Sequence, residues 1–193
     1  MREITRPMSE PNDGLAATPS EPAETIAEIY DRYSPQVERW ARRLAGPRLD
    51  PEDLLHDIFL IVLRRRHEFR GEAKITTWLF RITAQVVRWR RRNDALRRWL
   101  WGRHGGELAE ARTSVPTPVE EIERREQSAR LYAALDRLPE KYRTTLVLFA
   151  LEGLPGEEIA ALTGTDVGTV WVRLHRARAR LADLLVEEKE RTS

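Results

Sequence analysis

Arginine and tryptophan side chains are interleaved between residues 78 and 103 of this 193-residue chain. The set comprises Trp78, Arg81, Arg88, Trp89, Arg90, Arg91, Arg92, Arg97, Arg98, Trp99, Trp101 and Arg103. Only Asp94 opposes the arginines, and so dense a positive charge repels itself unless a polyanion lies against it. Guanidinium groups neutralise phosphates, and indole rings stack on unpaired bases. The chemistry that this segment predicts is the binding of single-stranded nucleic acid.

The same segment also fits a buried helical face. Apolar residues recur there at spacings of three and four, at Ile75, Trp78, Leu79, Ile82, Val86 and Trp89. Trp78 and Trp89 are therefore either core residues or base-stacking residues, and for each taken alone the spacing favours the core.

A second basic helix follows a helix-turn-helix pattern. Ala160 is small enough for two helices to approach, Gly164 permits a positive φ, and Asp166 can cap the next helix. No acidic residue lies between Val167 and Ala182, whereas this stretch carries Arg173, Arg176, Arg178 and Arg180. We predict that the exposed side of this helix meets DNA phosphates. The alternative is a solvated face on an ordinary helical hairpin.

Trp171 in the second basic helix has two possible roles. It lies on an apolar stripe with Val167, Val170 and Leu174, which favours packing into the core. Its ring could instead touch a thymine methyl group in the major groove. We predict the core position.

Acidic side chains gather where another helix is expected to begin. They are Asp50, Glu52, Asp53 and Asp57, and no basic residue follows until Arg64. The same segment has more apolar residues than one buried stripe needs, at Leu54, Leu55, Ile58, Phe59, Ile61 and Val62. An acidic helix end beside exposed apolar groups indicates a protein partner. The alternative is favourable interaction of the acids with the helix dipole above an ordinary core.

Helices are the elements that must hold these groups, since no stretch alternates with period two for long enough to form a sheet. We expect an all-α chain of two small helical domains: an N-terminal helical bundle and a C-terminal four-helix domain with the helix-turn-helix, joined by a flexible linker. The boundaries are a disordered leader at 1–24, a first domain at 25–101, a linker at 102–123 and a second domain at 124–187. Within the first helix we expect Ser34-Pro35 to cause a break or kink.

Composition limits the possible functions. The chain has no cysteine, which excludes disulfides and thiolate zinc sites and fits a reducing cytoplasm. No apolar run is long enough to span a bilayer. The four histidines lack metal-ligand spacing, and there is neither a phosphate-binding glycine loop nor a nucleophile elbow. We therefore expect no catalytic residue, no metal, no cofactor and no small-molecule substrate.

Taken together, these residues resemble the extracytoplasmic-function sigma factors from about Ile26 to Leu185. Segment 50–59 is similar to that family's polymerase-clamp-binding helix, and segments 69–73 and 77–82 are similar to the part that opens and reads the minus-ten element. The region that reads the minus-thirty-five element is similar to segments 135–139, 152–154, 158–160, 167–170 and 173–178.

The resemblance implies a cytoplasmic DNA-binding subunit whose partners are core RNA polymerase, promoter DNA and an anti-sigma factor. It implies polymerase-binding roles for Asp53, Leu54, Asp57 and Phe59. It implies DNA-binding roles for Arg70, Trp78, Arg81, Gln85, Arg88, Arg92, Thr169, Arg173, Arg176 and Arg178. No promoter sequence carries over, because Gln85, Pro155-Gly156 and Trp171-Val172 depart from the family pattern. The alternatives are a stand-alone helix-turn-helix regulator, which would need only residues after Val119, and a helical enzyme acting on nucleic acid.

Overall fold

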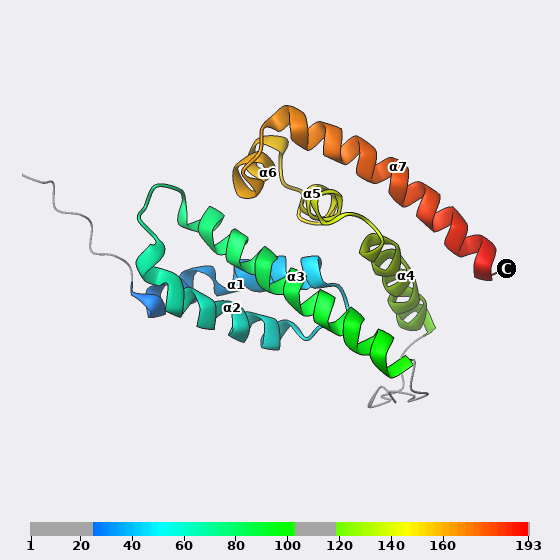
Figure 1. The fold of residues 1–193 in the computed structure, drawn as a ribbon, viewed down its shortest axis with the longest axis horizontal. Helices are drawn as coiled ribbons and strands as arrows, with labels where there is room; N and C mark the ends of the chain where they lie inside the picture. The colour runs from blue at the N-terminus through cyan, green and yellow to red at the C-terminus, as the bar shows by residue number, and fades with distance from the viewer. Residues whose placement is uncertain (1–24, 103–118, 193) are drawn as a thin grey trace, which may run out of the picture.

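The computed structural model describes residues 25–102 and 119–192, and every element in these ranges is helical. The elements are α1 (Ile26–Ala45), α2 (Pro51–Arg65), the 3-10 turn η1 (Arg66–Glu68), α3 (Ile75–Gly102), α4 (Val119–Asp136), α5 (Glu140–Ala150), α6 (Gly156–Thr163) and α7 (Val167–Thr192). Helices α1 to α3 pack together as an N-terminal half, and α4 to α7 form a C-terminal half (Figure 1). The all-α prediction is confirmed.

Local capping sets the helix starts that the sequence predicts. Thr25 and Glu28 form a capping box at α1. The Asp50 carboxylate accepts the backbone N–H of Glu52 at 2.8 Å and of Asp53 at 3.2 Å, which begins α2. Each cap satisfies backbone donors that would otherwise lack a partner, so these starts need no tertiary contact.

A break or kink was predicted at Ser34-Pro35, and the break is wrong, because α1 runs through Pro35 as one helix. Buried residues on both sides hold it in place: Ile29 before the proline, and Val37 and Trp40 after it. Packing of both halves of the helix therefore offsets the backbone hydrogen bond that proline removes.

The predicted linker 102–123 is too long at both ends, since Gly102 belongs to α3 and residues 119–123 belong to α4. Ion pairs one turn apart favour the early start of α4, with Glu121 paired to Arg125 at 2.5 Å and Glu126 to Arg130 at 3.2 Å. The rest of that linker, 103–118, and the predicted leader 1–24 lie outside the described residues.

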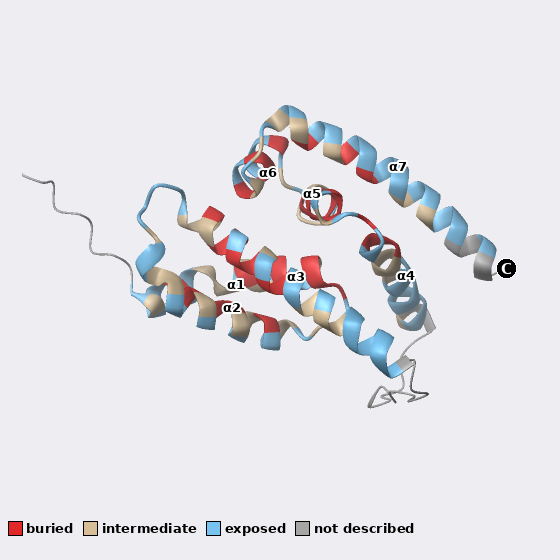
Figure 2. Ribbon diagram, in the orientation of Figure 1, coloured by how far each residue is buried: buried red, intermediate tan, exposed pale blue. Residues whose placement is uncertain are grey.

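The buried apolar side chains of the two halves form one continuous cluster. In the N-terminal half the Trp40 ring meets the Phe80 ring edge-on at a centroid distance of 5.3 Å, above fully buried Leu54, Ile58 and Leu79. In the C-terminal half the largest buried side chains are Leu148, Ile159 and Leu174. Figure 2 shows the buried residues on the inward faces of the helices, with the C-terminal ends of α3 and α7 exposed.

The two halves meet where α1 contacts α5 and α3 contacts α6. Arg143 of α5 is fully buried at this junction and donates from Nη2 to the carbonyl oxygen of Leu44 at 2.6 Å. Its Nη1 lies 3.1 Å from the Asp136 carboxylate. Burial and the neighbouring Arg91 lower the pKa of Arg143 to about 10, so the guanidinium stays charged at neutral pH and needs these partners.

A second buried charge, of opposite sign, joins the halves. The Glu152 carboxylate is only 2% exposed and lies 2.9 Å from each of Arg39 and Arg43 on α1. The Tyr132 hydroxyl donates to the Arg43 carbonyl at 3.1 Å. We name Arg39, Arg43, Asp136, Arg143 and Glu152 the junction charges. The sequence predicted two domains joined only by a flexible linker, whereas in the structure the two halves contact each other through the junction charges.

Candidate nucleic-acid and partner-binding surfaces

A cup lies where the segment before α3 meets the start of that helix. The Phe69 and Trp78 rings line it, tilted by 41° at a centroid distance of 5.4 Å. The cup has a volume of about 420 Å³, and its other lining residues are His67, Glu68, Arg70, Glu72, Ala73 and Arg81. Trp78 is half-buried, so its ring both packs on Phe69 and borders the cup. An aromatic cup with arginines at its rim can hold one unpaired base.

One rim carboxylate is fixed as an anion. The Arg65 side chain donates to Glu68 at 2.6 Å, and this hydrogen bond lowers the pKa of Glu68. This negative group, at a rim that also carries Arg70, Glu72 and Arg81, can accept hydrogen bonds from a base edge.

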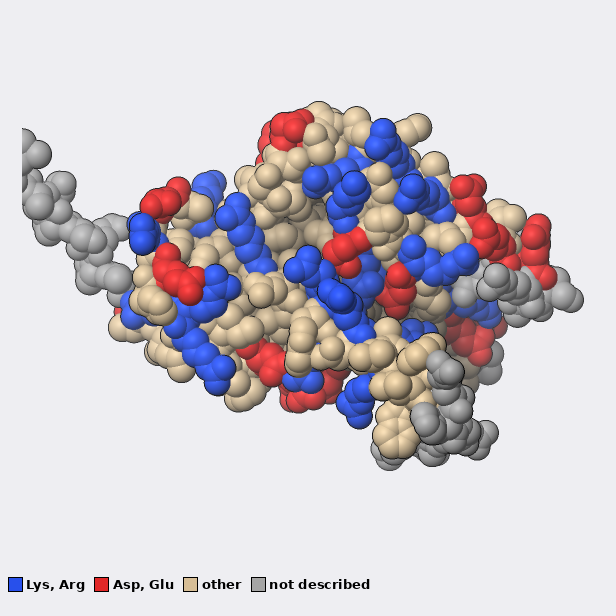
Figure 3. Space-filling view, in the orientation of Figure 1, with Lys and Arg blue, Asp and Glu red and all other residues tan. Residues whose placement is uncertain are grey.

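Basic side chains gather along α7 and over the middle of α3 on one face of the molecule, and acidic side chains gather at the far end of α7 (Figure 3). The structure divides the arginine run of α3 into two sets. Arg90 pairs with Asp57 of α2, and Arg91 pairs with Asp136 at 2.9 Å and Glu140 at 3.0 Å. Arg88 and Arg92 are exposed. Two arginines that looked alike in the sequence thus hold helices together, and two others remain available for phosphates.

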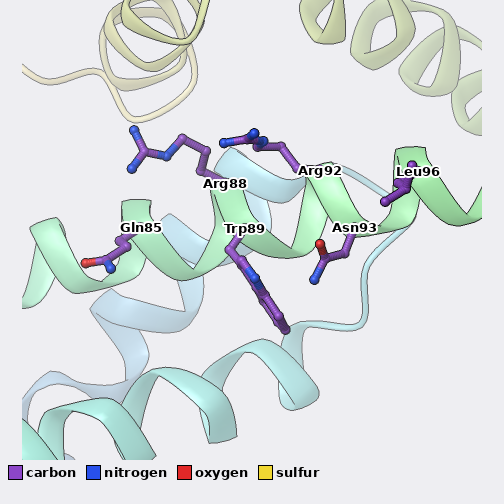
Figure 4. Close-up of a pocket in the computed structure, with 6 residues that line it drawn as sticks. All are labelled: Gln85, Arg88, Trp89, Arg92, Asn93 and Leu96. Atoms are coloured by element: carbon purple, nitrogen blue, oxygen red, sulfur yellow. The ribbon is translucent and has the colours of Figure 1, made fainter.

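The exposed set lies on one stretch of α3. Figure 4 shows Arg88 and Arg92 pointing to the same side of the helix, with Trp89 and Asn93 on the opposite side and Gln85 one turn before. These side chains and Leu96 line a shallow hollow of about 560 Å³. Trp89 is 57% exposed, so its predicted place in the buried stripe is wrong. The stripe passes instead through Val86 and Val87, which are 4% and 1% exposed and turn position 89 outward.

The helix-turn-helix has the predicted geometry. Gly164 ends α6 with a φ of 64°, and the Asp166 carboxylate accepts the Thr169 N–H at 2.7 Å to begin α7. The Thr169 hydroxyl also donates to Asp166 at 2.6 Å, and these two bonds lower the pKa of Asp166. Thr169, one of the residues assigned to DNA, therefore already serves the helix cap.

The arginines of α7 divide in a similar way. Arg178 lies over the Phe149 ring at 5.1 Å and Arg180 over the Tyr142 ring at 5.1 Å, so both also stabilise the fold. A hydrogen bond from Arg176 lowers the pKa of Tyr142, and Arg176 is exposed. Arg173 is half-buried and faces the N-terminal half.

Trp171 is 48% exposed, and the predicted core position is wrong. Its ring meets Phe149 edge-on at 5.7 Å and lies against Gly156, where an added Cβ would be 3.0 Å from the ring. The apolar stripe is continued by Val170 and Leu174, which turns position 171 to the side of the helix. The ring is therefore held along one edge and open on the other.

A cleft of about 660 Å³ runs between the two halves. Arg81, Gln85 and Arg88 of α3 line one wall, and Arg173 of α7 lies on the other. Arg81 also reaches the helix-turn-helix, because an added Cβ at Gly164 would lie 3.2 Å from its Nη2. A space of this size suits a small molecule or a side-chain cluster and is too small for duplex DNA. In this arrangement the basic groups of the two halves face each other.

The acidic helix α2 presents a different face from the one expected. Leu54 and Phe59, assigned to a protein partner, are 1% and 8% exposed and belong to the core. Asp57 is half-buried in its ion pair with Arg90. The exposed side chains of α2 instead follow helical spacing through Asp53, His56, Leu60 and Leu63. We name these four residues the α2 stripe. The sequence alone missed Leu60 and Leu63 because buried and exposed leucines look the same in it.

No group of three or more histidine, aspartate or glutamate side chains in ranges 25–102 and 119–192 could hold a metal ion. No helix in those ranges is long and apolar enough to cross a membrane.

The chain matches two protein families. Residues 29–98 match "Sigma-70 region 2", which covers α1 to α3, and residues 128–181 match "Sigma-70, region 4", which covers the helix-turn-helix. Among curated proteins, it is 30% identical over 160 residues to RNA polymerase sigma factor NccH of Alcaligenes xylosoxydans xylosoxydans, which covers 83% of this chain and 86% of that one. It is 31% identical over 165 residues to ECF RNA polymerase sigma factor SigM of Mycobacterium tuberculosis, covering 82% and 76%.

A solved structure has the same fold. The sigma factor RpoE, in its complex with the anti-sigma factor NepR from Bartonella quintana, aligns with a TM-score of 0.53 at 23% identity. The alignment covers 82% of this chain and 95% of RpoE. The arrangement of helices is thus shared at low sequence identity.

Proposed function

This chain belongs to the sigma-70 family of RNA polymerase sigma factors, in its extracytoplasmic-function group, and we propose that its two halves divide promoter recognition as follows. It is an alternative sigma factor that binds core RNA polymerase and directs transcription initiation. One observation carries this assignment: a region 2 match over residues 29–98 precedes a region 4 match over residues 128–181. A stand-alone helix-turn-helix regulator would need only the second match.

The N-terminal half takes the minus-ten element. An unpaired base of the non-template strand enters the cup between Phe69 and Trp78, with Arg70 and Arg81 beside it. The strand continues along α3, where Arg88 and Arg92 neutralise phosphates and the Gln85 amide can contact a base edge. This order follows from the position of the cup at the start of α3 and the exposed arginines further along it.

The C-terminal half takes the minus-thirty-five element. Helix α7 enters the major groove with its first turns, as recognition helices do. Arg173 and Arg176 then meet phosphates or base edges, for which Arg176 leaves the Tyr142 side chain. Thr169 supports the helix cap through Asp166, and Arg178 can reach DNA only if it leaves the Phe149 ring.

Both halves can bind DNA at once only if they move apart. Arg81, Gln85, Arg88 and Arg173 line one cleft of about 660 Å³, which cannot hold a duplex. Promoter binding therefore separates α3 from α6 and α7 and exposes these side chains to DNA.

Core polymerase binds the α2 stripe. Acidic Asp53 and the exposed apolar side chains of Leu60 and Leu63 lie on one helix face. A charged rim beside apolar groups is the usual composition of a protein interface. An anti-sigma factor is the second protein partner that we propose, as NepR is for RpoE, and the chain acts in the cytoplasm, where its polymerase is.

The experiment that tests this function is size-exclusion chromatography of the full chain with core polymerase, followed by transcription from genomic DNA. Co-elution and new transcript starts are expected. Failure to co-elute would favour a stand-alone regulator, and nuclease or ligase activity with a divalent metal would favour an enzyme.

The variant Asp53→Arg should bind core polymerase at least about tenfold more weakly, because it places a like charge where complementarity is expected. Asp53 is exposed, and its favourable contact with the helix dipole contributes only about 0.3–1 kcal/mol, so folding should persist. Asp57 is not substituted, because its carboxylate forms an ion pair with Arg90.

Asp183→Arg is the matched control, since Asp183 is an exposed aspartate on α7, far from α2 along the chain. Affinities from titration with labelled core polymerase compare the two variants. Equal affinities would remove the α2 stripe from the interface.

A further inference from the structure

Val172 is an apolar side chain on the outer surface of the proposed recognition helix. It is 49% exposed, whereas Val170, Leu174 and Ala177 of the same helix are at most 1% exposed. Successive side chains are about 100° apart around a helix axis. Val172 therefore lies about 200° from Val170 and points away from the domain core. It therefore occupies the side of α7 that faces the major groove when the first turns of this helix enter DNA.

The surroundings of Val172 leave its methyl groups open. Side chains on a helix tilt toward the N-terminus, so Val172 leans over position 168, one turn before. That position is Gly168, which is exposed, and an added Cβ there would lie 3.2 Å from the Asp166 Oδ1 atom that caps the helix. A side chain at 168 would need the capping carboxylate to shift by a few tenths of an ångström. With glycine there, the space over position 168 beside Val172 remains free for a ligand group.

The side chains on either side of Val172 already make contacts within the protein. The Thr169 hydroxyl donates to Asp166, and the Trp171 ring lies against Phe149 and Gly156 at the side of the helix. One turn after Val172, Arg176 is exposed, and it can hold a phosphate or a guanine edge once it leaves the Tyr142 side chain. Val172 is then an apolar group between a glycine and an arginine, at the centre of the outward face.

We propose that Val172 determines promoter specificity by contacting the C5-methyl group of a thymine in the upstream element. This inference rests on the proposed function and names a specificity residue for it. The thymine methyl is the one apolar group that a base pair presents in the major groove. A valine side chain is stiff about χ1, so it presents its methyl groups to the base with little loss of conformational freedom.

The test removes only the C5-methyl group of each thymine. Holoenzyme assembled from the full chain and core polymerase first selects duplexes from a random upstream library, which gives the bound element. Each thymine of that element is then replaced in turn by deoxyuridine, and the affinity of the holoenzyme is measured by competition. One or two replacements should weaken binding about fourfold, the ratio that corresponds to burial of one methyl group.

The same series is repeated with Val172→Ala, which should bind the thymine duplex about as weakly as the wild type binds the deoxyuridine duplex and should lose sensitivity to that replacement. Val186→Ala is the matched control, because Val186 is an exposed valine near the other end of α7, and it should keep full sensitivity. A deoxyuridine penalty that persists in Val172→Ala, or no penalty at any thymine, overturns the inference while leaving the proposed function intact. Selection of no duplex at all overturns the proposed function itself, and this inference with it.

Discussion

Arg143→Met should lower the melting temperature of this chain by roughly 10 °C. Removing one partner of a buried charge pair costs about 3–5 kcal/mol, and a domain of this size loses about 2–4 °C per kcal/mol. The variant leaves the Leu44 carbonyl without its donor and leaves Asp136 with less of its neutralising charge. Methionine retains much of the volume, so the loss reports on the charged contacts more than on a cavity.

Arg137→Met is the matched control. Arg137 lies in the turn before α5 and pairs with Glu187 at 2.7 Å, but its side chain is 45% exposed. Exposed pairs contribute about 0–1 kcal/mol, so this variant should melt within about 4 °C of the wild type. Calorimetry compares the two, and similar melting temperatures would mean that the junction charges do not stabilise the chain. Small-angle scattering on the same samples should show a larger radius of gyration for Arg143→Met, because the hydrogen bond to Leu44 joins the halves.

Replacing Arg88 and Arg92 together by glutamine should weaken open-complex formation by about 25- to 60-fold at 0.1 M salt. The logarithm of the binding constant falls linearly with the logarithm of the salt concentration, and we call the steepness of this line the salt slope. The loss of two phosphate contacts lowers the salt slope by about 1.4 for single strands and about 1.8 for duplex DNA. At 0.1 M salt, one decade below 1 M, these differences correspond to losses of about 25- and 60-fold. Both side chains are exposed and point to one side of α3 (Figure 4), so their loss should leave the fold unchanged.

The matched control removes the same net charge elsewhere. Arg125 and Arg130 lie on α4 and pair with Glu121 and Glu126. Arg125→Gln with Arg130→Gln should leave the salt slope within about 0.3 of the wild type, since these arginines are not placed against DNA. Open complexes formed by the holoenzyme are measured between 50 and 200 mM salt. A slope that is the same for both double variants would show that Arg88 and Arg92 act only through overall charge.

The helices of this protein could be predicted from the sequence because their signals are local. Caps such as Asp50 and Asp166 act on backbone groups two or three residues away, and the helix-turn-helix depends on Gly164 and its immediate neighbours. The order of segments was likewise enough to predict the family, and the comparisons confirm it. The role of each binding residue in contact with polymerase or DNA stays a prediction.

The tertiary structure decided which members of each set are available for partners. Arg90 and Arg91 are paired with carboxylates, whereas Arg88 and Arg92 are exposed. The carboxylates belong to residues that lie 33 to 49 positions away in sequence, namely Asp57, Asp136 and Glu140. Local spacing cannot show such pairs, since it gives the direction of a side chain on its own helix and not what the neighbouring helix places opposite it.

The same limit explains the apolar residues. Spacing placed Trp89 and Trp171 on buried stripes, and the packed helices leave both exposed. The family resemblance gave Leu54 and Phe59 polymerase-binding roles, and the packed helices bury both. A periodic pattern gives the directions of side chains relative to one another around a helix. Which of these directions becomes buried depends on where the other helices lie. The sequence by itself thus determined that the chain is helical, the capped starts of its helices and the family. Only the packing of α1 to α3 against one another and against α4 to α7 decided which side chains form the core, which join the halves and which remain free to bind.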